Sequence, residues 1–159
     1  MSGIIGSAGS KSGLTDTDIR FVAHGNNQGD VSIADNAYII WGAIDVNKGG
    51  GYNTSNGYFT APISGYYNFE FSYYSYSSSD PDTYAFIYYD VTNSDVILRC
   101  YHRNLPKDSM MHSALYNHHM VGGEQLAIRN GRGYARNIYL NSAQHGLFQG
   151  YLQQAGGKW

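Results

Sequence analysis

The chain contains the residue types that hydrolytic enzymes use, so catalysis is the first class of function to weigh. Twelve acidic residues and six histidines accompany many serines in 159 residues. A serine nucleophile needs a sharp turn such as Gly-x-Ser-x-Gly to expose its hydroxyl, and the sequence does not contain that pattern. The ingredients of a catalytic triad are therefore present without the element that would position them.

Paired carboxylates would offer a second chemistry, the acid–base cleavage of glycosidic bonds. Glu70 and Glu124 are the two glutamates, and either could take an aspartate as its partner. Glu70 falls on the polar side of a predicted strand and Glu124 lies beside a predicted turn. A solvated or interface role is therefore the favoured interpretation, and we predict that the protein is not an enzyme.

The histidines near residue 115 offer a third chemistry, metal binding. Alternation along a strand puts His112, Ala114, Tyr116 and His118 on one face and His119 on the other. Around a threefold axis one such histidine becomes three, which can bind a metal ion. Hydrogen-bonded surface or interface histidines are the favoured alternative. We therefore expect no cofactor and keep His118 as the candidate ligand should a metal be bound.

The elements that must position these residues are strands. Glycine (20) and tyrosine (16) are abundant, glutamate is scarce, and helical periodicity is missing. Ten segments with β-favouring residues and turn residues between them lie at 19–23, 37–41, 57–60, 65–76, 83–91, 96–102, 112–119, 125–129, 135–140 and 146–152. The sequence therefore predicts an all-β fold, a ten-stranded antiparallel jelly-roll sandwich.

Composition excludes two classes of partner. Charged residues make up 14% of the chain and the net charge is −2, without the basic patch typical of a nucleic-acid binder. No run approaches the roughly 18 apolar residues of a membrane helix. We expect neither nucleic-acid binding nor membrane insertion.

The aromatic residues of two neighbouring segments follow different patterns. From Gly65, alternation puts Tyr67, Phe69, Phe71 and Tyr73 on one face, as in a strand with one buried face. Segment 83–91 is instead apolar or aromatic on both faces, so it needs a second packed surface, most simply another subunit. The predicted interface between subunits consists of Tyr84, Ala85, Phe86, Ile87, Tyr88 and Tyr89.

A longer pattern of spaced residues resembles a known family. The pattern comprises Trp41, Asn47, Tyr52, Phe59, Gly65, Tyr67, Phe69, Phe71, Phe148 and Gly150. In type and spacing it is similar to the globular head of complement component C1q and the wider tumour-necrosis-factor-like group, except that Trp41 stands where the family usually has phenylalanine. The resemblance implies a ten-stranded jelly roll with these aromatics in its core. It also implies homotrimers around an aromatic-lined axis.

The predicted organisation has three parts: an N-terminal arm (1–17), the jelly roll (18–153) and a C-terminal tail (154–159). The arm is rich in glycine and serine, and its apolar residues are Ile4, Ile5 and Leu14. Such a segment cannot form a core by itself, so we expect it to attach the domain to a larger assembly, the alternative being that it lies on its own domain. Its sequence SGIIGSAGSKSG resembles N-terminal segments of small virion proteins from tailed bacteriophages.

These inferences favour a non-enzymatic structural protein on the virion surface. The arm would tether the trimer to other virion proteins, as in a capsid decoration protein or a head fibre. The alternative is a short tail fibre that recognises host-surface glycan, because tyrosines stack on sugar rings while amides and carboxylates bind hydroxyls. The candidate glycan-binding residues are Tyr52, Asn53, Asn56, Asp80, Asp82, Tyr101, Arg103, Arg132 and Tyr134.

Overall fold

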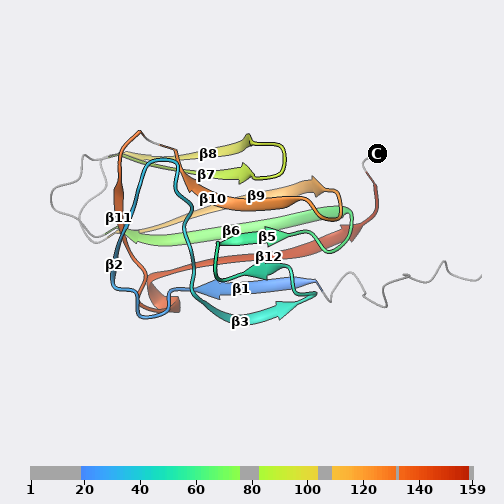
Figure 1. The fold of residues 1–159 in the computed structure, drawn as a ribbon, viewed down its shortest axis with the longest axis horizontal. Helices are drawn as coiled ribbons and strands as arrows, with labels where there is room; N and C mark the ends of the chain where they lie inside the picture. The colour runs from blue at the N-terminus through green and yellow to red at the C-terminus, as the bar shows by residue number, and fades with distance from the viewer. Residues whose placement is uncertain (1–18, 76–82, 104–108, 132, 158–159) are drawn as a thin grey trace, which may run out of the picture.

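The computed structural model describes residues 19–75, 83–103, 109–131 and 133–157, and these form a two-layer β-sandwich (Figure 1). They contain twelve strands and one 3₁₀ turn, η1 (Ala143–His145). Within these ranges there is no helix long and apolar enough to cross a membrane. The longest strands run along the long axis of the molecule, and all strand pairings are antiparallel.

Sheet A has seven strands. They are β1 (Arg20–His24), β2 (Asp30–Ile33), β3 (Ala43–Lys48), β6 (Gly65–Ser75), β9 (Ser109–Met120), β11 (Arg136–Tyr139) and β12 (Gly146–Ala155). Their order is β2-β11-β6-β12-β1-β3, and β9 pairs with the other edge of β6. The central strand β6 is thus hydrogen-bonded along both edges.

Sheet B has five strands and lies over sheet A. They are β4 (Tyr52–Asn53), β5 (Tyr58–Thr60), β7 (Thr83–Asp90), β8 (Asp95–Arg103) and β10 (Gln125–Asn130), in the order β4-β5-β10-β7-β8. Tyr88 ties the two sheets together. Its hydroxyl crosses the core from β7 and donates to the carbonyl oxygen of Ser113 at 2.8 Å and of Phe69 at 3.4 Å.

The core between the sheets is aromatic. Tyr67, Phe69, Phe71 and Tyr73 all face it with no exposed area, as alternation along β6 predicts. Phe148 joins them from β12 and contacts the Trp41 ring, with 5.3 Å between ring centroids. The other core members at positions of the family pattern are Trp41, Tyr52 and Phe59.

Two polar or small residues of the pattern shape this core without filling it. Asn47 holds the entry to β4, since its amide nitrogen donates to the Tyr52 carbonyl at 3.0 Å and its oxygen accepts from the Tyr52 N–H at 3.1 Å. At Gly150 a Cβ atom would lie 2.6 Å from the Phe69 ring and 2.7 Å from the Phe21 ring. A side chain at this position would displace two core rings.

The fold class is confirmed, but the strands differ from the predicted ten in two ways. Segment 37–41 is not a strand, because it makes only an isolated bridge from Tyr38 to Arg129 while Ile39 and Trp41 point into the core. Strands β2, β3 and β4 were not predicted. Their polar residues interrupt the apolar alternation that signals a strand.

Strand β7 is covered on both faces by its own chain. Phe86 and Tyr88 point into the core with no exposed area, so the inner face of β7 is not a surface on which a second subunit could pack. On the outer face Ala85 and Ile87 have no exposed area either, and Tyr89 is 8% exposed. The side chain of Tyr84 lies outside the described part of the chain.

A β-bulge in β9 changes which histidine faces outward. Register with β6 shifts between Tyr67 and Phe69, and Asn117 on β9 has a positive φ of 54°. As a result His118 lies opposite the core residue Tyr67, whereas His119 lies opposite Tyr66 and packs against its ring at 5.1 Å. The prediction that His112 and His118 share one face is therefore wrong, because the bulge lies between them.

Candidate interaction surface on sheet A

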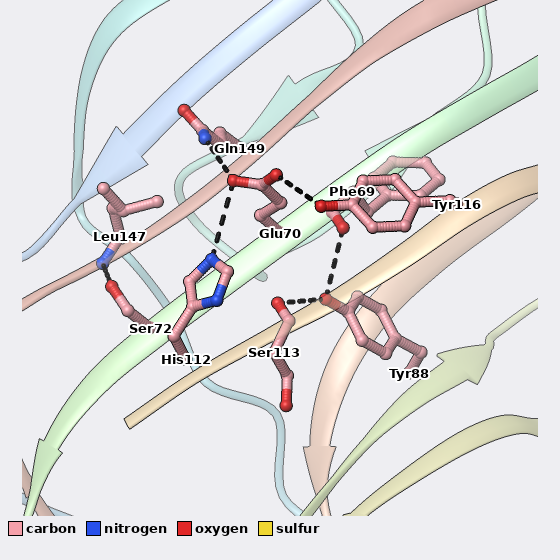
Figure 2. A network of polar contacts seen from close by, with 9 residues as sticks. All are labelled: Phe69, Glu70, Ser72, Tyr88, His112, Ser113, Tyr116, Leu147 and Gln149. Atoms are coloured by element: carbon pink, nitrogen blue, oxygen red, sulfur yellow. Dashed lines mark hydrogen bonds and ion pairs between the residues drawn. The ribbon is translucent and has the colours of Figure 1, made fainter. Parts of the chain in front are cut away.

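The outer face of sheet A carries a network of polar contacts centred on Glu70 (Figure 2). The Glu70 carboxylate accepts a hydrogen bond from the Gln149 amide at 2.8 Å and one from the Tyr116 hydroxyl at 3.1 Å. The imidazole Nε2 of His112 lies 3.6 Å from the same carboxylate. Residues from β6, β9 and β12 therefore meet at one acid on the middle strand.

These contacts stabilise the ionised form of Glu70. The hydrogen bond from Gln149 lowers the pKa of the carboxyl group most, with help from Tyr116 and His112 against an opposing effect of partial burial. Glu70 is thus held as a carboxylate whose partners come from both neighbouring strands. This is the environment of a structural acid and the opposite of a general acid, which needs a raised pKa.

A second cluster on the same face is built at the bulge. The amide oxygen of Asn68 accepts the Asn117 N–H at 2.8 Å, and its amide nitrogen donates to the Tyr151 hydroxyl at 2.9 Å. Asn68 is 5% exposed, so a buried amide fixes both the bulge and a tyrosine of β12. The backbone irregularity is therefore satisfied by a side chain of the strand it faces.

Large aromatic rings project from this polar layer. Tyr116 is 58% exposed and Tyr151 is 47% exposed, although the hydroxyl of each is hydrogen-bonded to the sheet. A hollow of about 520 Å³ lies over β1 and β12, with Gln149 and Tyr151 in its lining. Anchored rings next to a hollow suit contact with another protein surface. We use "sheet A face" for Tyr66, Asn68, Glu70, His112, Tyr116, Gln149 and Tyr151.

The residues proposed for catalysis or metal binding are not brought together. Glu124 accepts the Val121 N–H at 2.8 Å and so closes the turn before β10 instead of pairing with Glu70. No group of three or more histidine, cysteine, aspartate or glutamate side chains within the described ranges could hold a metal ion.

Three of the candidate glycan residues that the structure describes have contacts within the domain. Tyr52 is a core residue with 3% exposure, and its hydroxyl is hydrogen-bonded to the backbone of Trp41, so it is not available to a sugar. Asn53 accepts hydrogen bonds from Ser55 within its own turn. Tyr134 is exposed in the loop before β11, under the guanidinium of Arg136 at 3.7 Å.

Several further predictions fall outside the described residues. These are the arm residues Ile4, Ile5 and Leu14, the loop residues Asp80, Asp82 and Arg132, and the side chain of Arg103.

The fold and the sheet A face define a class: antiparallel jelly-roll sandwiches of the tumour-necrosis-factor and C1q type. The particular family follows from sequence. The C1q domain matches residues 21–153, which is most of the chain, and the protein belongs to this family. No sequence match to a curated protein was found.

Solved structures share the fold at low sequence identity. Eiger TNF from S. frugiperda is 17% identical with a TM-score of 0.70, over 90% of this chain and 98% of that one. The globular domain of zebrafish complement 1qA is 16% identical with a TM-score of 0.64, over 87% and 99%. Murine APRIL is 15% identical with a TM-score of 0.60, over 84% and 99%. At these identities the likeness shows the fold alone.

Sequence reasoning found Glu70 but not its partners. It placed Glu70 on the polar face of β6, yet Gln149 was not singled out, because it lies 79 positions away along the chain. Asn117 was the available signal for the bulge, since asparagine tolerates a positive φ better than most residues.

Proposed function

We propose that the protein is a non-enzymatic structural component of a tailed-phage virion, and that it assembles as a homotrimer through the sheet A face. The main observation in support of a trimer is that Tyr116 and Tyr151 are exposed on this face while their hydroxyl groups are hydrogen-bonded to the sheet. The family resemblance implies trimers around an aromatic-lined axis. The exposed tyrosines of the sheet A face could line such an axis.

A second copy is favoured over a different partner because the acid on this face is already hydrogen-bonded. The Glu70 carboxylate accepts hydrogen bonds from Gln149 and Tyr116, and the His112 imidazole lies 3.6 Å from it. Groups that already have partners lose less on desolvation than free ones. Exposed apolar side chains on the edge strands β8 and β9, Leu98 and Met110, extend the surface that a neighbour would cover.

The attachment role rests on where the jelly roll begins. Arg20 in β1 pairs with Tyr151 in β12, so the N-terminal end of β1 lies beside the C-terminal half of β12 at one end of the molecule. Residues 1–17 enter the domain at this end. We propose that they tether the trimer to the capsid or tail, with the opposite end projecting outward. The resemblance of SGIIGSAGSKSG to arms of small virion proteins supports the phage setting.

Light scattering on the full chain at micromolar concentration tests the assembly. We expect a mass three times that of the chain, and a folded monomer would overturn the trimer. Deletion of residues 1–17 tests the tether separately. The shortened protein should stay trimeric but be lost from purified particles of the phage that encodes it. Full attachment without the arm, or absence of the intact protein from those particles, would overturn the virion role.

A further inference from the structure

The outer face of sheet B carries a row of side chains that the proposed assembly does not use. Strand register places Tyr38, Arg129, Ile87 and Arg99 side by side across four chain segments. Partners directly opposite in antiparallel strands point to the same face. The two arginines flank Ile87 on the strands either side of β7, about 10 Å apart at the usual strand spacing.

Neither arginine has an acidic partner. Among the residues that the structure describes, the ion pairs are His24 with Asp45 and His112 with Glu70. Arg99 is exposed, and Arg129 is half-buried with its Nε buried and without a hydrogen-bond partner. A chain with net charge −2 thus keeps two uncompensated cations on one row.

The Arg129 guanidinium is nevertheless held in place. It stacks on the Tyr89 ring, with 3.6 Å between the Arg129 Cζ atom and the ring centroid. Tyr38 lies 6.2 Å from Tyr89 and meets Tyr58 edge to face at 5.0 Å, ring centroid to ring centroid. Stacking on a ring leaves the terminal nitrogens of a guanidinium able to donate, and two parallel N–H groups fit the two oxygens of one carboxylate.

The tyrosines around Arg129 add hydrogen-bond donors and ring surface. Burial and the neighbouring Tyr58 raise the pKa of Tyr38, against a smaller lowering effect of Arg129, so its hydroxyl stays protonated at neutral pH. On the far side of the row, Tyr101 is 50% exposed and follows Arg99 by two positions in β8. The row therefore has tyrosine rings at both ends.

We propose that this row binds a linear acidic polysaccharide, with Arg129 and Arg99 each binding a carboxylate and with Tyr38 and Tyr101 packing against the sugar rings. The row shares Tyr101 with the residues considered for glycan from the sequence, whereas Arg129, Arg99 and Tyr38 were not among them. The proposal does not depend on the trimer. A chain molecule with repeated carboxylates suits two cations separated by a flat, neutral stretch at Ile87.

A protein partner fits the row less well. Ile87, which lies between the arginines, and Ala85, two positions before it on the same face of β7, have no exposed area. A second protein would gain little apolar burial there, although stable interfaces bury about 800 Å² of surface on each partner around an apolar core. What remains for a ligand is charge, hydroxyl groups and ring edges.

Titration of the full chain with oligogalacturonate, with dextran fragments of equal length and with oligo(dT) tests the proposal. We expect oligogalacturonate to bind and to weaken as salt rises, whereas dextran should not bind. Arg99→Gln and Arg129→Gln should each lower affinity about tenfold, and the double variant about a hundredfold. The control Arg20→Gln/Lys48→Gln removes the same charge elsewhere and should leave affinity unchanged.

Four results would each overturn the proposal: no binding of oligogalacturonate at millimolar concentration, equal binding of dextran, tighter binding of oligo(dT), or an equal loss of affinity in the control variant. If Arg129→Gln does not fold, as judged by circular dichroism, Arg99→Gln combined with Tyr101→Ser repeats the test on exposed residues alone. That pair should lower affinity more than Arg99→Gln does.

Discussion

The outer faces of the two sheets differ in whether their charged side chains have partners within the chain. On sheet A the one central charge, Glu70, has partners on both neighbouring strands. On sheet B Arg99 and Arg129 have no acidic partner within the described ranges, and the nearest support for Arg129 is the Tyr89 ring. A face that satisfies its own hydrogen bonds can be buried at low cost, whereas unpaired cations favour water or an anionic ligand. The difference suggests one face for self-association and the other for an external ligand.

The largest effect should come from placing a charge on the sheet A face. Tyr116→Arg adds a cation to a surface that would be repeated around the threefold axis, so we expect the trimer to dissociate. Light scattering at micromolar concentration should show a threefold lower mass. Tyr101→Arg makes the same change at a similarly exposed tyrosine of sheet B and should stay trimeric. If the two variants behave alike, the distinction between the faces is lost.

The next effect tests how firmly the two sheets are joined. Tyr88→Phe removes the hydroxyl that reaches from sheet B to the Ser113 carbonyl. We expect the free energy of unfolding to fall by about 1–2 kcal/mol, because a buried acceptor loses its donor. Urea denaturation at fixed protein concentration measures it. Tyr101→Phe, at a tyrosine of sheet B that is 50% exposed, should stay within about 0.5 kcal/mol.

A smaller effect is expected when the charge of Glu70 on sheet A or of Arg99 on sheet B is removed and the losses of stability are compared. Glu70→Gln keeps the shape but weakens the bonds from Gln149 and Tyr116, and we expect a loss of about 1 kcal/mol in the free energy of unfolding. Arg99→Gln should cost less than about 0.5 kcal/mol, since no partner depends on it. Equal losses in the same urea experiment would mean that the sheet A network is not structural.

The smallest effect is a pH dependence confined to sheet A. The pKa of Glu70 is lowered in the folded protein from its ordinary value of 4.5, so the folded state favours the carboxylate. Its stabilising effect is therefore fully present above pH 4.5 and disappears as the pH falls below that value through the lowered pKa. Thermal unfolding of wild-type protein and Glu70→Gln should converge in this range. A constant difference down to pH 2 would contradict the assignment.

Sequence reasoning succeeded where the burial of a strand can be predicted from the residues of that strand alone. Alternation along β6 predicts the buried set from Tyr67 to Tyr73, and the type and spacing of aromatic, asparagine and glycine residues predict the family. It failed where burial depends on other strands. The two apolar faces of β7 suggested a second subunit, but Phe86 faces the core and Ile87 is covered by neighbouring side chains. Local patterns do not show which long side chains lie over a strand.

The same limit explains what was missed on the two surfaces. Glu70 was recognised as a polar-face residue, whereas its partner Gln149 depends on the pairing of β6 with β12. The row from Tyr38 to Arg99 exists only through strand register, and segment 37–41 was taken for a full strand. One bulge at Asn117 was enough to exchange the faces of His118 and His119.

The position of β12 has a consequence for biosynthesis. This strand is the last of the described strands to be translated, yet it lies between β1 and β6 in the middle of sheet A. Sheet A cannot close until residues 146–155 have left the ribosome, so it is completed only after the last of its described strands has been made. A nascent chain that stalls before Gly146 leaves β1 and β6 with open edges, which are sites for aggregation with other unfinished chains.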